Sequence, residues 1–143
     1  MELRRRRDED AQRALAEAAR QVRAAESGLQ REERRLADTL ALAAVEEAAL
    51  TDLSRAIWHR NWMRRQRLVI EAARRQLDER HAAERAAAAD AMDARRKLRA
   101  LERLRERMWQ AFLAAERRAE QKDLDVLAGL RYVARHGSAP GGA

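Results

Sequence analysis

Apolar residues recur at every seventh position along most of this chain, and the recurrence predicts two long helices. In the first half the row is Leu15, Val22, Leu29, Leu36, Ala43, Leu50 and Ile57. In the second half the row is Met63, Ile70, Leu77, Glu84, Ala91, Leu98, Arg105, Phe112, Ala119, Val126 and Val133. A row of apolar residues spaced by seven, together with a second row three positions further along, forms a narrow apolar stripe on a helix. Such a stripe is buried only when it packs against another helix. The pattern is that of a coiled coil.

The expected helices cover about 2–50 and about 62–135, with a bend at about 51–61. Thr51, Asp52 and Ser54 favour a helix cap because their side chains compete for backbone N–H groups, and Asn61 is a second candidate. Two arms joined by a short connection fold most simply into an antiparallel hairpin. The fold class expected is all-α: an antiparallel two-helix coiled-coil hairpin over 1–135, with a flexible tail at 136–143. One helix continuous through 51–61 is the alternative.

Polar residues interrupt the predicted seam. Glu32, Thr39 and Glu46 fall on the second row of the first helix, and Glu84 and Arg105 fall on core positions of the second. Such residues cost stability but can fix the register of pairing. The pattern does not select among seven-residue slips of one arm along the other. Since the second arm is the longer, one of its ends is expected to project.

Composition agrees with a slender helical molecule. Charged residues make up 38% of the chain and aromatic residues only 3%, which leaves too few large side chains for a broad core. The net charge is +7, from 31 basic and 24 acidic residues, a modest excess that does not by itself identify a partner. There is no cysteine and no apolar run of membrane-spanning length, and the charged N-terminus lacks the apolar segment of a secretory signal. We therefore expect a cytoplasmic protein with no direct membrane insertion.

Nothing in the sequence indicates an enzyme. His59, His81 and His136 share no metal-ligand spacing, and no Gly-rich loop precedes a helix in a phosphate-binding arrangement. No Ser or Thr has an evident general base beside it, and a two-helix rod offers no cavity that excludes water. No cofactor, metal or catalytic residue is therefore expected.

Two segments are candidates for protein binding. Trp58 and Trp62 lie four residues apart on one helix face near the bend, where they either fill the apex of the hairpin or form a recognition patch. Near the C-terminus, Leu124, Leu127 and Leu130 lie off the two seam rows, so they would be exposed if this end stands clear of the first helix, and such a surface suggests a partner.

Several local matches, in one order along the chain, resemble the flagellar FliJ family, the coiled-coil stalk proteins of the type III export ATPase. The chain carries L-x-x-L-x-E-R at Leu101–Arg107 and Q-K-x-x-D-x-x-A at Gln121–Ala128. Trp62 matches the aromatic residue that opens the family's second helix, and Ile70 and Leu77 match its heptad positions. The likeness covers most of 57–130, while the first helix matches only in character. The first helix lacks the family's tyrosines, and Gln66 stands where the family prefers an apolar residue.

The resemblance implies a function and a set of partners. Family members form an antiparallel coiled coil whose paired termini enter the pore of a hexameric export ATPase, while the bent end contacts the cytoplasmic domain of the export gate; they also escort export chaperones. Carried onto this chain, the resemblance places Gln121, Lys122, Asp125 and Arg131 against the ATPase ring, with Arg4–Arg7 nearby. It places Trp58 and Trp62 at the gate-facing tip. The protein would then lie peripherally at the cytoplasmic face of the inner membrane, through its partners.

Three alternatives remain open at this point. The equivalent stalk protein of a virulence type III secretion injectisome shares the architecture and the roles of the partners. A parallel homodimeric coiled-coil scaffold would arise if the chain did not bend. A nucleic-acid-binding coiled coil is disfavoured, because Asp8–Asp10 directly follow Arg4–Arg7 and a DNA-binding basic region keeps acids away from phosphates. No nucleic acid is therefore expected among the partners.

Overall fold

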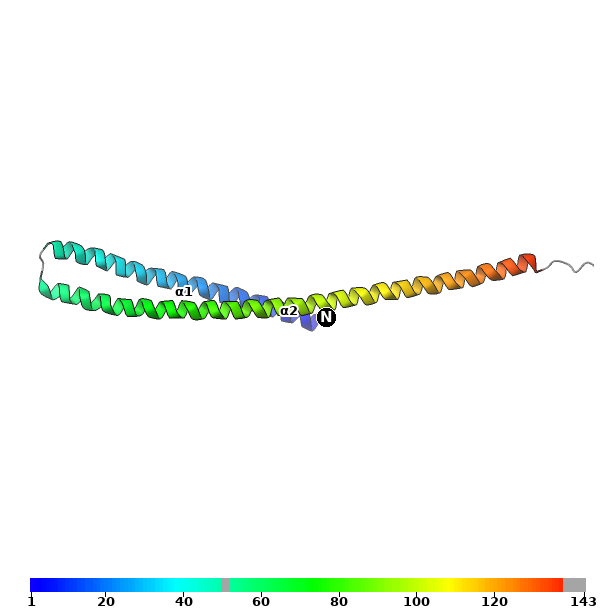
Figure 1. Cartoon of the computed structure of the whole chain (residues 1–143), viewed down its shortest axis with the longest axis horizontal. Helices are drawn as coiled ribbons and strands as arrows, with labels where there is room; N and C mark the ends of the chain where they lie inside the picture. Colours follow the sequence, from blue (N-terminus) through cyan, green and yellow to red (C-terminus); the bar gives the residue numbers. More distant parts are fainter. Residues whose placement is uncertain (50–51, 138–143) are drawn as a thin grey trace, which may run out of the picture. The chain divides into compact units, whose positions relative to one another are not determined.

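The computed structural model describes residues 1–49 and 52–137, and in them the chain forms two long α-helices. Helix α1 spans Glu2–Ala48 and helix α2 spans Leu53–His136. In the hairpin, the two helices pack side by side and run in opposite directions (Figure 1). The described residues contain no strand. The prediction of an all-α, antiparallel two-helix hairpin is confirmed.

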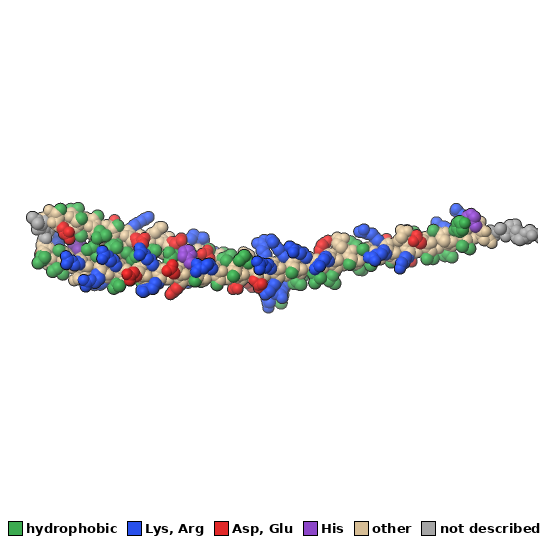
Figure 2. Space-filling model, viewed as in Figure 1, with side chains coloured by type: hydrophobic (Ala, Val, Ile, Leu, Met, Phe, Trp, Pro, Cys, Tyr) green, Lys and Arg blue, Asp and Glu red, His purple; other side chains and the backbone are tan. Residues whose placement is uncertain are grey.

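The chain divides into two units. The first is Glu2–Lys97, which holds all of α1 and the part of α2 that packs on it, and which we call the hairpin. The second consists of Leu98–Ala143 with Met1, and its described part is Met1, the remainder of α2 and Gly137. We call residues 98–136 the C-terminal helical segment. On the face of the hairpin seen in Figure 2, basic and acidic side chains are interspersed along both helices.

The turn between the helices is shorter than expected. Residues 53–61 are helical, so the prediction of a bend at about 51–61 and of a second helix starting near Trp62 was wrong. Asp52 determines the start of α2: its Oδ1 accepts the backbone N–H of Ser54 at 3.1 Å and its Oδ2 accepts the Ser54 hydroxyl at 2.6 Å. A side-chain carboxylate that accepts the first free N–H groups is a favourable N-cap. Asn61, the second cap candidate, lies inside α2, and Thr51 lies outside the described residues.

The same contacts lower the pKa of the Asp52 carboxyl group. The hydrogen bond from the Ser54 hydroxyl, followed by the one from its backbone N–H, lowers the pKa of Asp52 below its usual value of 3.8. Because the pKa of Asp52 is lower in the folded state, its ionised carboxylate adds to stability at pH values above its unfolded-state pKa. This contribution is lost as the pH falls through the folded-state pKa.

The other helix ends lie close to their expected positions. Helix α1 ends at Ala48 instead of near residue 50, and α2 ends at His136 instead of Arg135. Gly137 follows, and its N–H donates to the carbonyl oxygen of Val133 at 2.6 Å. The flexible tail expected at 136–143 lies, from residue 138 onward, outside the described residues.

The core of the hairpin is a narrow seam made by the predicted rows. Four apolar residues on these rows are buried: Val22, Ala43, Ile70 and Ala91. Other members of the same rows are half-buried, namely Leu15, Leu29, Leu36, Met63 and Leu77. Two helices in contact cover only a stripe of each other, so few residues become fully buried. The heptad rows of the hairpin therefore lie at the helix–helix interface, as predicted.

Polar contacts between the helices fix how they are aligned. The amide of Gln66 is buried and donates to Glu32 on α1 twice, to the carboxylate at 2.7 Å and to the backbone carbonyl at 3.1 Å. Nearer the turn, the Nε2 of His59 lies 2.6 Å from a carboxylate oxygen of Glu46. Glu32 and Glu46 are two of the three residues that interrupt the seam row of α1, and each meets a polar residue of α2. By contrast, Glu84 pairs with a residue of its own helix, since a carboxylate oxygen of Glu84 lies 3.6 Å from the Nδ1 of His81.

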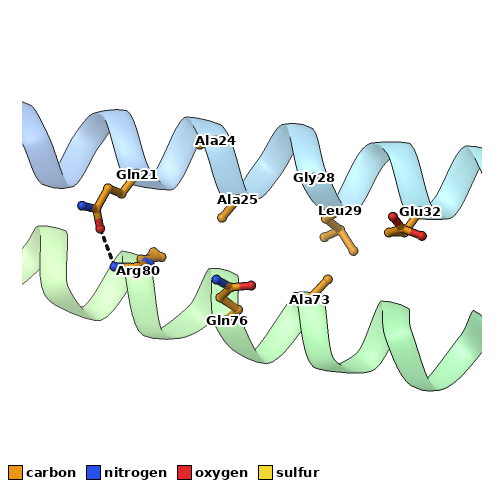
Figure 3. A pocket seen from close by; sticks show the side chains of 9 residues that line it. All are labelled: Gln21, Ala24, Ala25, Gly28, Leu29, Glu32, Ala73, Gln76 and Arg80. Atoms are coloured by element: carbon orange, nitrogen blue, oxygen red, sulfur yellow. Dashed lines mark hydrogen bonds between the residues drawn. The ribbon is translucent and has the colours of Figure 1, made fainter.

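Small side chains leave an open groove along the middle of the seam. The groove has a volume of about 380 Å³ and is lined in part by Ala24, Ala25, Gly28 and Ala73. Figure 3 shows Leu29 above Ala73 and Arg80 reaching across to Gln21, to which it donates a hydrogen bond. A Cβ added at Gly28 would meet no atom nearer than the Nη2 of Arg31 at 3.9 Å. There is therefore room for a larger residue at this position.

We predict that Gly28→Ala stabilises the hairpin by about 0.5–1 kcal/mol, because alanine lowers the entropy lost on helix formation and fits without strain. Urea unfolding followed by circular dichroism measures the difference. A destabilised variant would show that the two helices approach more closely at Gly28 than the structure indicates.

We predict that Gln66→Ala destabilises the hairpin by about 1–2 kcal/mol, since it leaves Glu32 in the seam without its partner. The double variant Glu32→Leu with Gln66→Leu should recover most of this loss, because two apolar side chains replace the pair. Free energies of unfolding for Glu32→Leu, Gln66→Leu and the double variant complete the cycle. Additive losses would contradict a direct interaction between the two residues.

Candidate interaction surfaces

The first candidate surface lies at the turn of the hairpin. Large apolar side chains are exposed on both helices there, and we call them the tip surface: Leu42, Val45, Leu53, Ile57 and Trp58. Trp58 is 58% exposed, whereas Trp62 is half-buried. Of the two interpretations of the tryptophans, filling the apex fits Trp62 better and a surface patch fits Trp58.

Trp58 is held next to the buried polar pair at the tip. Its ring meets the ring of His59 edge to face, with centroids 5.2 Å apart. His59 is 7% exposed. Because a carboxylate only accepts hydrogen bonds, the Nε2 of His59 carries the proton that is donated to Glu46. Arg55 lies 3.4 Å from the other carboxylate oxygen of Glu46. The exposed indole is thus anchored on a polar network that joins the two helices.

The second candidate surface is the C-terminal helical segment. Gln121, Lys122, Asp125 and Arg131 are all exposed, as the resemblance requires of residues that contact a partner. The Nε2 of Gln121 donates to Asp125 at 2.9 Å. Gln121, Asp125 and Ala128 are spaced i, i+4, i+7, so they lie on one face of the helix. Leu124, Leu127 and Leu130 are exposed as expected, each by more than half.

The seam predicted beyond Leu98 is not buried in this chain. Phe112 is 50% exposed, Val126 61% and Val133 64%, and Arg105 and Ala119 are exposed as well. These rows lie in the second unit, since the hairpin unit ends at Lys97, and the sequence had left open which part of the longer second arm would be left uncovered. These rows are exposed in this chain, whereas their heptad pattern predicts that a helix of a partner covers them.

Sequence reasoning missed one cluster and one pairing. Trp109 stacks on Phe112 with ring centroids 5.6 Å apart, and Met108 beside them is 65% exposed. Three large apolar residues within five positions were the available signal. The partnership of Glu46 with His59 was also missed, although both lie on seam rows of their helices.

Within residues 1–49 and 52–137 there is no cluster of three acidic or histidine side chains placed to hold a metal ion. Neither helix, over its described length, carries an apolar run long enough to cross a membrane.

Comparison of the chain with protein-family models, with curated proteins and with solved structures finds no match.

We predict that Trp58→Ala changes the free energy of unfolding by less than about 0.5 kcal/mol, as for other exposed positions. Trp62→Ala, at a half-buried position, should cost about 1–2 kcal/mol through lost packing. Urea denaturation of both variants compares them directly. Equal losses would mean that Trp58 packs as part of the hairpin and is not a free surface group.

Proposed function

We propose that this chain is a non-enzymatic stalk of a flagellar type III protein export apparatus. In this role the C-terminal helical segment contacts the ring of a hexameric export ATPase, and the tip surface contacts the cytoplasmic domain of the export gate. The observation that carries the proposal is the exposed Gln121–Asp125 pair, which stands on a helix face free to meet another protein. The order and spacing of the matching residues from Trp62 to Ala128 support it further.

The architecture supports a mechanical role. A paired-helix hairpin resists bending better than a single helix, so it can transmit a displacement along its length. The chain supplies no reacting group of its own in this proposal. It alters the ATPase through differential contacts with the states of the ring, which is an allosteric effect.

The tip supports the second contact. Trp58 exposes its indole and contacts the ring of His59 edge to face. Trp is enriched among the interface residues that contribute most of the binding energy. The family's tyrosines are absent from α1, so Trp58 together with Leu53 and Ile57 would supply the apolar contact with the gate. In this proposal the protein is cytoplasmic, lies at the inner membrane only through its partners, and escorts export chaperones.

We predict that the intact chain raises the ATP hydrolysis rate of a cognate export ATPase, and that a chain truncated before Gln121 does not. The truncation removes the residues proposed to face the ring but leaves the hairpin complete. Steady-state phosphate release measures the effect. Equal stimulation by both chains would reject the placement of this end in the ring.

A matched control separates the motif from chain length. A chain truncated after His136 keeps the whole of α2 and should stimulate as well as the intact chain. Gln121→Ala with Asp125→Ala, two exposed substitutions, should reduce stimulation without changing the helical circular dichroism signal. Full stimulation by this double variant would show that the paired side chains are not part of the contact.

A further inference from the structure

The first part of α2 combines positive charge with exposed apolar side chains. Residues 53–70 contain no acidic residue and five exposed arginines, namely Arg55, Arg60, Arg64, Arg65 and Arg67. Among these five, and within the described residues, only Arg55 forms an ion pair, with Glu46 at 3.4 Å. Figure 2 shows basic side chains beside hydrophobic ones along α2 near the turn. The stretch therefore carries positive charge that the hairpin leaves largely without a counter-charge.

Much of this charge lies on the side of α2 that faces away from α1. Residues nine apart stand on opposite sides of a helix, because nine residues make about two and a half turns. Gln66 and Ile70 are buried in the seam, whereas Ile57 and Asn61, nine positions before them, are exposed. We call this outer side the basic face; it consists of Ile57, Trp58, Asn61, Arg64, Arg65 and Leu68, with Arg60 and Arg67 on its flank.

Apolar and basic side chains share the basic face. Ile57, Trp58 and Leu68 are each more than half exposed, so they contribute little to the hairpin itself. Arg64 and Arg65 follow Ile57 and Trp58 by seven positions, about two turns, and therefore lie on the same lines of the helix. An arginine can lay its stem along an apolar surface while its charged end stays in a polar layer. This combination is typical of helices that lie in a membrane interface.

We propose that the basic face binds the surface of a membrane rich in anionic lipids, with the hairpin lying along that surface. The guanidinium groups pair with headgroup phosphates, which arginine can bind through two parallel hydrogen bonds. Ile57, Trp58 and Leu68 enter the boundary between headgroups and acyl chains, a region that suits the amphipathic indole ring. The contact is shallow, and neither helix over its described length is apolar enough to cross a membrane.

The shape of the basic face favours lipid over a protein or a nucleic acid. The face is the convex outer side of one helix, and from Ile57 to Leu68 it is about 16 Å long. A protein partner would need a matching concave surface with acids at fixed places, whereas lipid headgroups move sideways to meet each arginine. A nucleic-acid backbone would pair with the arginines but would leave Ile57 and Leu68 uncovered.

The acids nearby do not cancel the charge of the basic face. Three acids of α1 are engaged by residues of α2, namely Glu32, Glu33 and Glu46. Asp38 and Glu47 are exposed, but they belong to α1, which lies behind α2 as seen from this face. Glu71, the first acid after the stretch, stands four residues from both Arg67 and Arg75, so positive charge remains in excess there.

This contact does not depend on the proposed function, which places the chain at the membrane through its partners. It requires neither the ATPase nor the export gate, and Gln121–Arg131 take no part in it. Ile57 and Trp58 also belong to the tip surface, so the test uses vesicles with no other protein present. Vesicle binding therefore succeeds or fails separately from stimulation of the ATPase.

Co-sedimentation of the full-length chain with lipid vesicles tests the proposal. Vesicles of equal parts phosphatidylglycerol and phosphatidylcholine should bind the chain, and vesicles of phosphatidylcholine alone should not. Added salt should weaken binding, because it screens exposed charges. Arg64→Gln with Arg65→Gln should lower the partition coefficient by about tenfold or more, since each arginine near an anionic surface contributes about fivefold.

A matched control separates the basic face from net charge. Arg95→Gln with Arg96→Gln removes another adjacent, exposed pair of arginines on α2 and should bind within about twofold of the unchanged chain. Circular dichroism should show the same helical content for both double variants. Equal losses in the two variants, absence of binding to anionic vesicles, or equal binding to neutral ones would overturn the proposal. Binding to soluble poly-glutamate without binding to vesicles would also overturn it, in favour of an acidic protein.

Two tryptophans of similar exposure test where the membrane is met. Trp58 is 58% exposed and Trp109, in the C-terminal helical segment, is 54% exposed. Trp58→Ala should weaken vesicle binding by about fivefold or more, because less apolar area leaves water. Trp109→Ala should leave it unchanged. A loss confined to Trp109→Ala would assign the contact to the C-terminal helical segment and contradict the proposal.

Discussion

The alignment of the hairpin depends on the contact between Gln66 and Glu32. The apolar rows repeat every seven residues, so sliding one helix by seven positions would place apolar residues against apolar residues again. Such a slip would move Gln66 opposite Ala25 or Thr39, and would leave Glu32 facing Ala73 or His59. Of these three registers, only the observed one gives Gln66 a carboxylate and a carbonyl oxygen together. A polar residue that weakens the seam thus makes one register more stable than its neighbours.

Much of the fold could be predicted from the sequence, and the exceptions have physical causes. The heptad rows require that each helix be covered by another, and burial of Val22, Ala43, Ile70 and Ala91 follows from them. The turn was misplaced because the segment holds several residues with capping side chains, and the sequence does not show which of them captures the free N–H groups. Gln66 was taken as a departure from an apolar position, whereas its role became clear only once Glu32 was opposite it.

The candidate surfaces were predictable to a lesser degree. The residues Gln121, Lys122, Asp125 and Arg131 are exposed, but exposure alone does not identify a partner. The tip was expected to use Trp58 and Trp62 together, and the structure separates them into an exposed and a half-buried side chain. Beyond Leu98 the heptad rows predict a partner helix, and the structure leaves their large apolar members exposed in this chain. They could not show at which residue the hairpin stops, because a repeating pattern carries no information on where the shorter helix ends.

The C-terminal helical segment is amphipathic in a way that separates two kinds of contact. Its apolar face is wider than a two-row seam, since Trp109, Leu113 and Leu127 extend it on one flank. The Gln121–Asp125 face on the opposite side is polar and carries no large apolar anchor apart from Tyr132. Burial of apolar area provides most of the free energy of association, whereas polar contacts contribute mainly direction and specificity. A durable association is therefore expected on the apolar face, while the polar face suits a contact that must form and break as the states of a partner change.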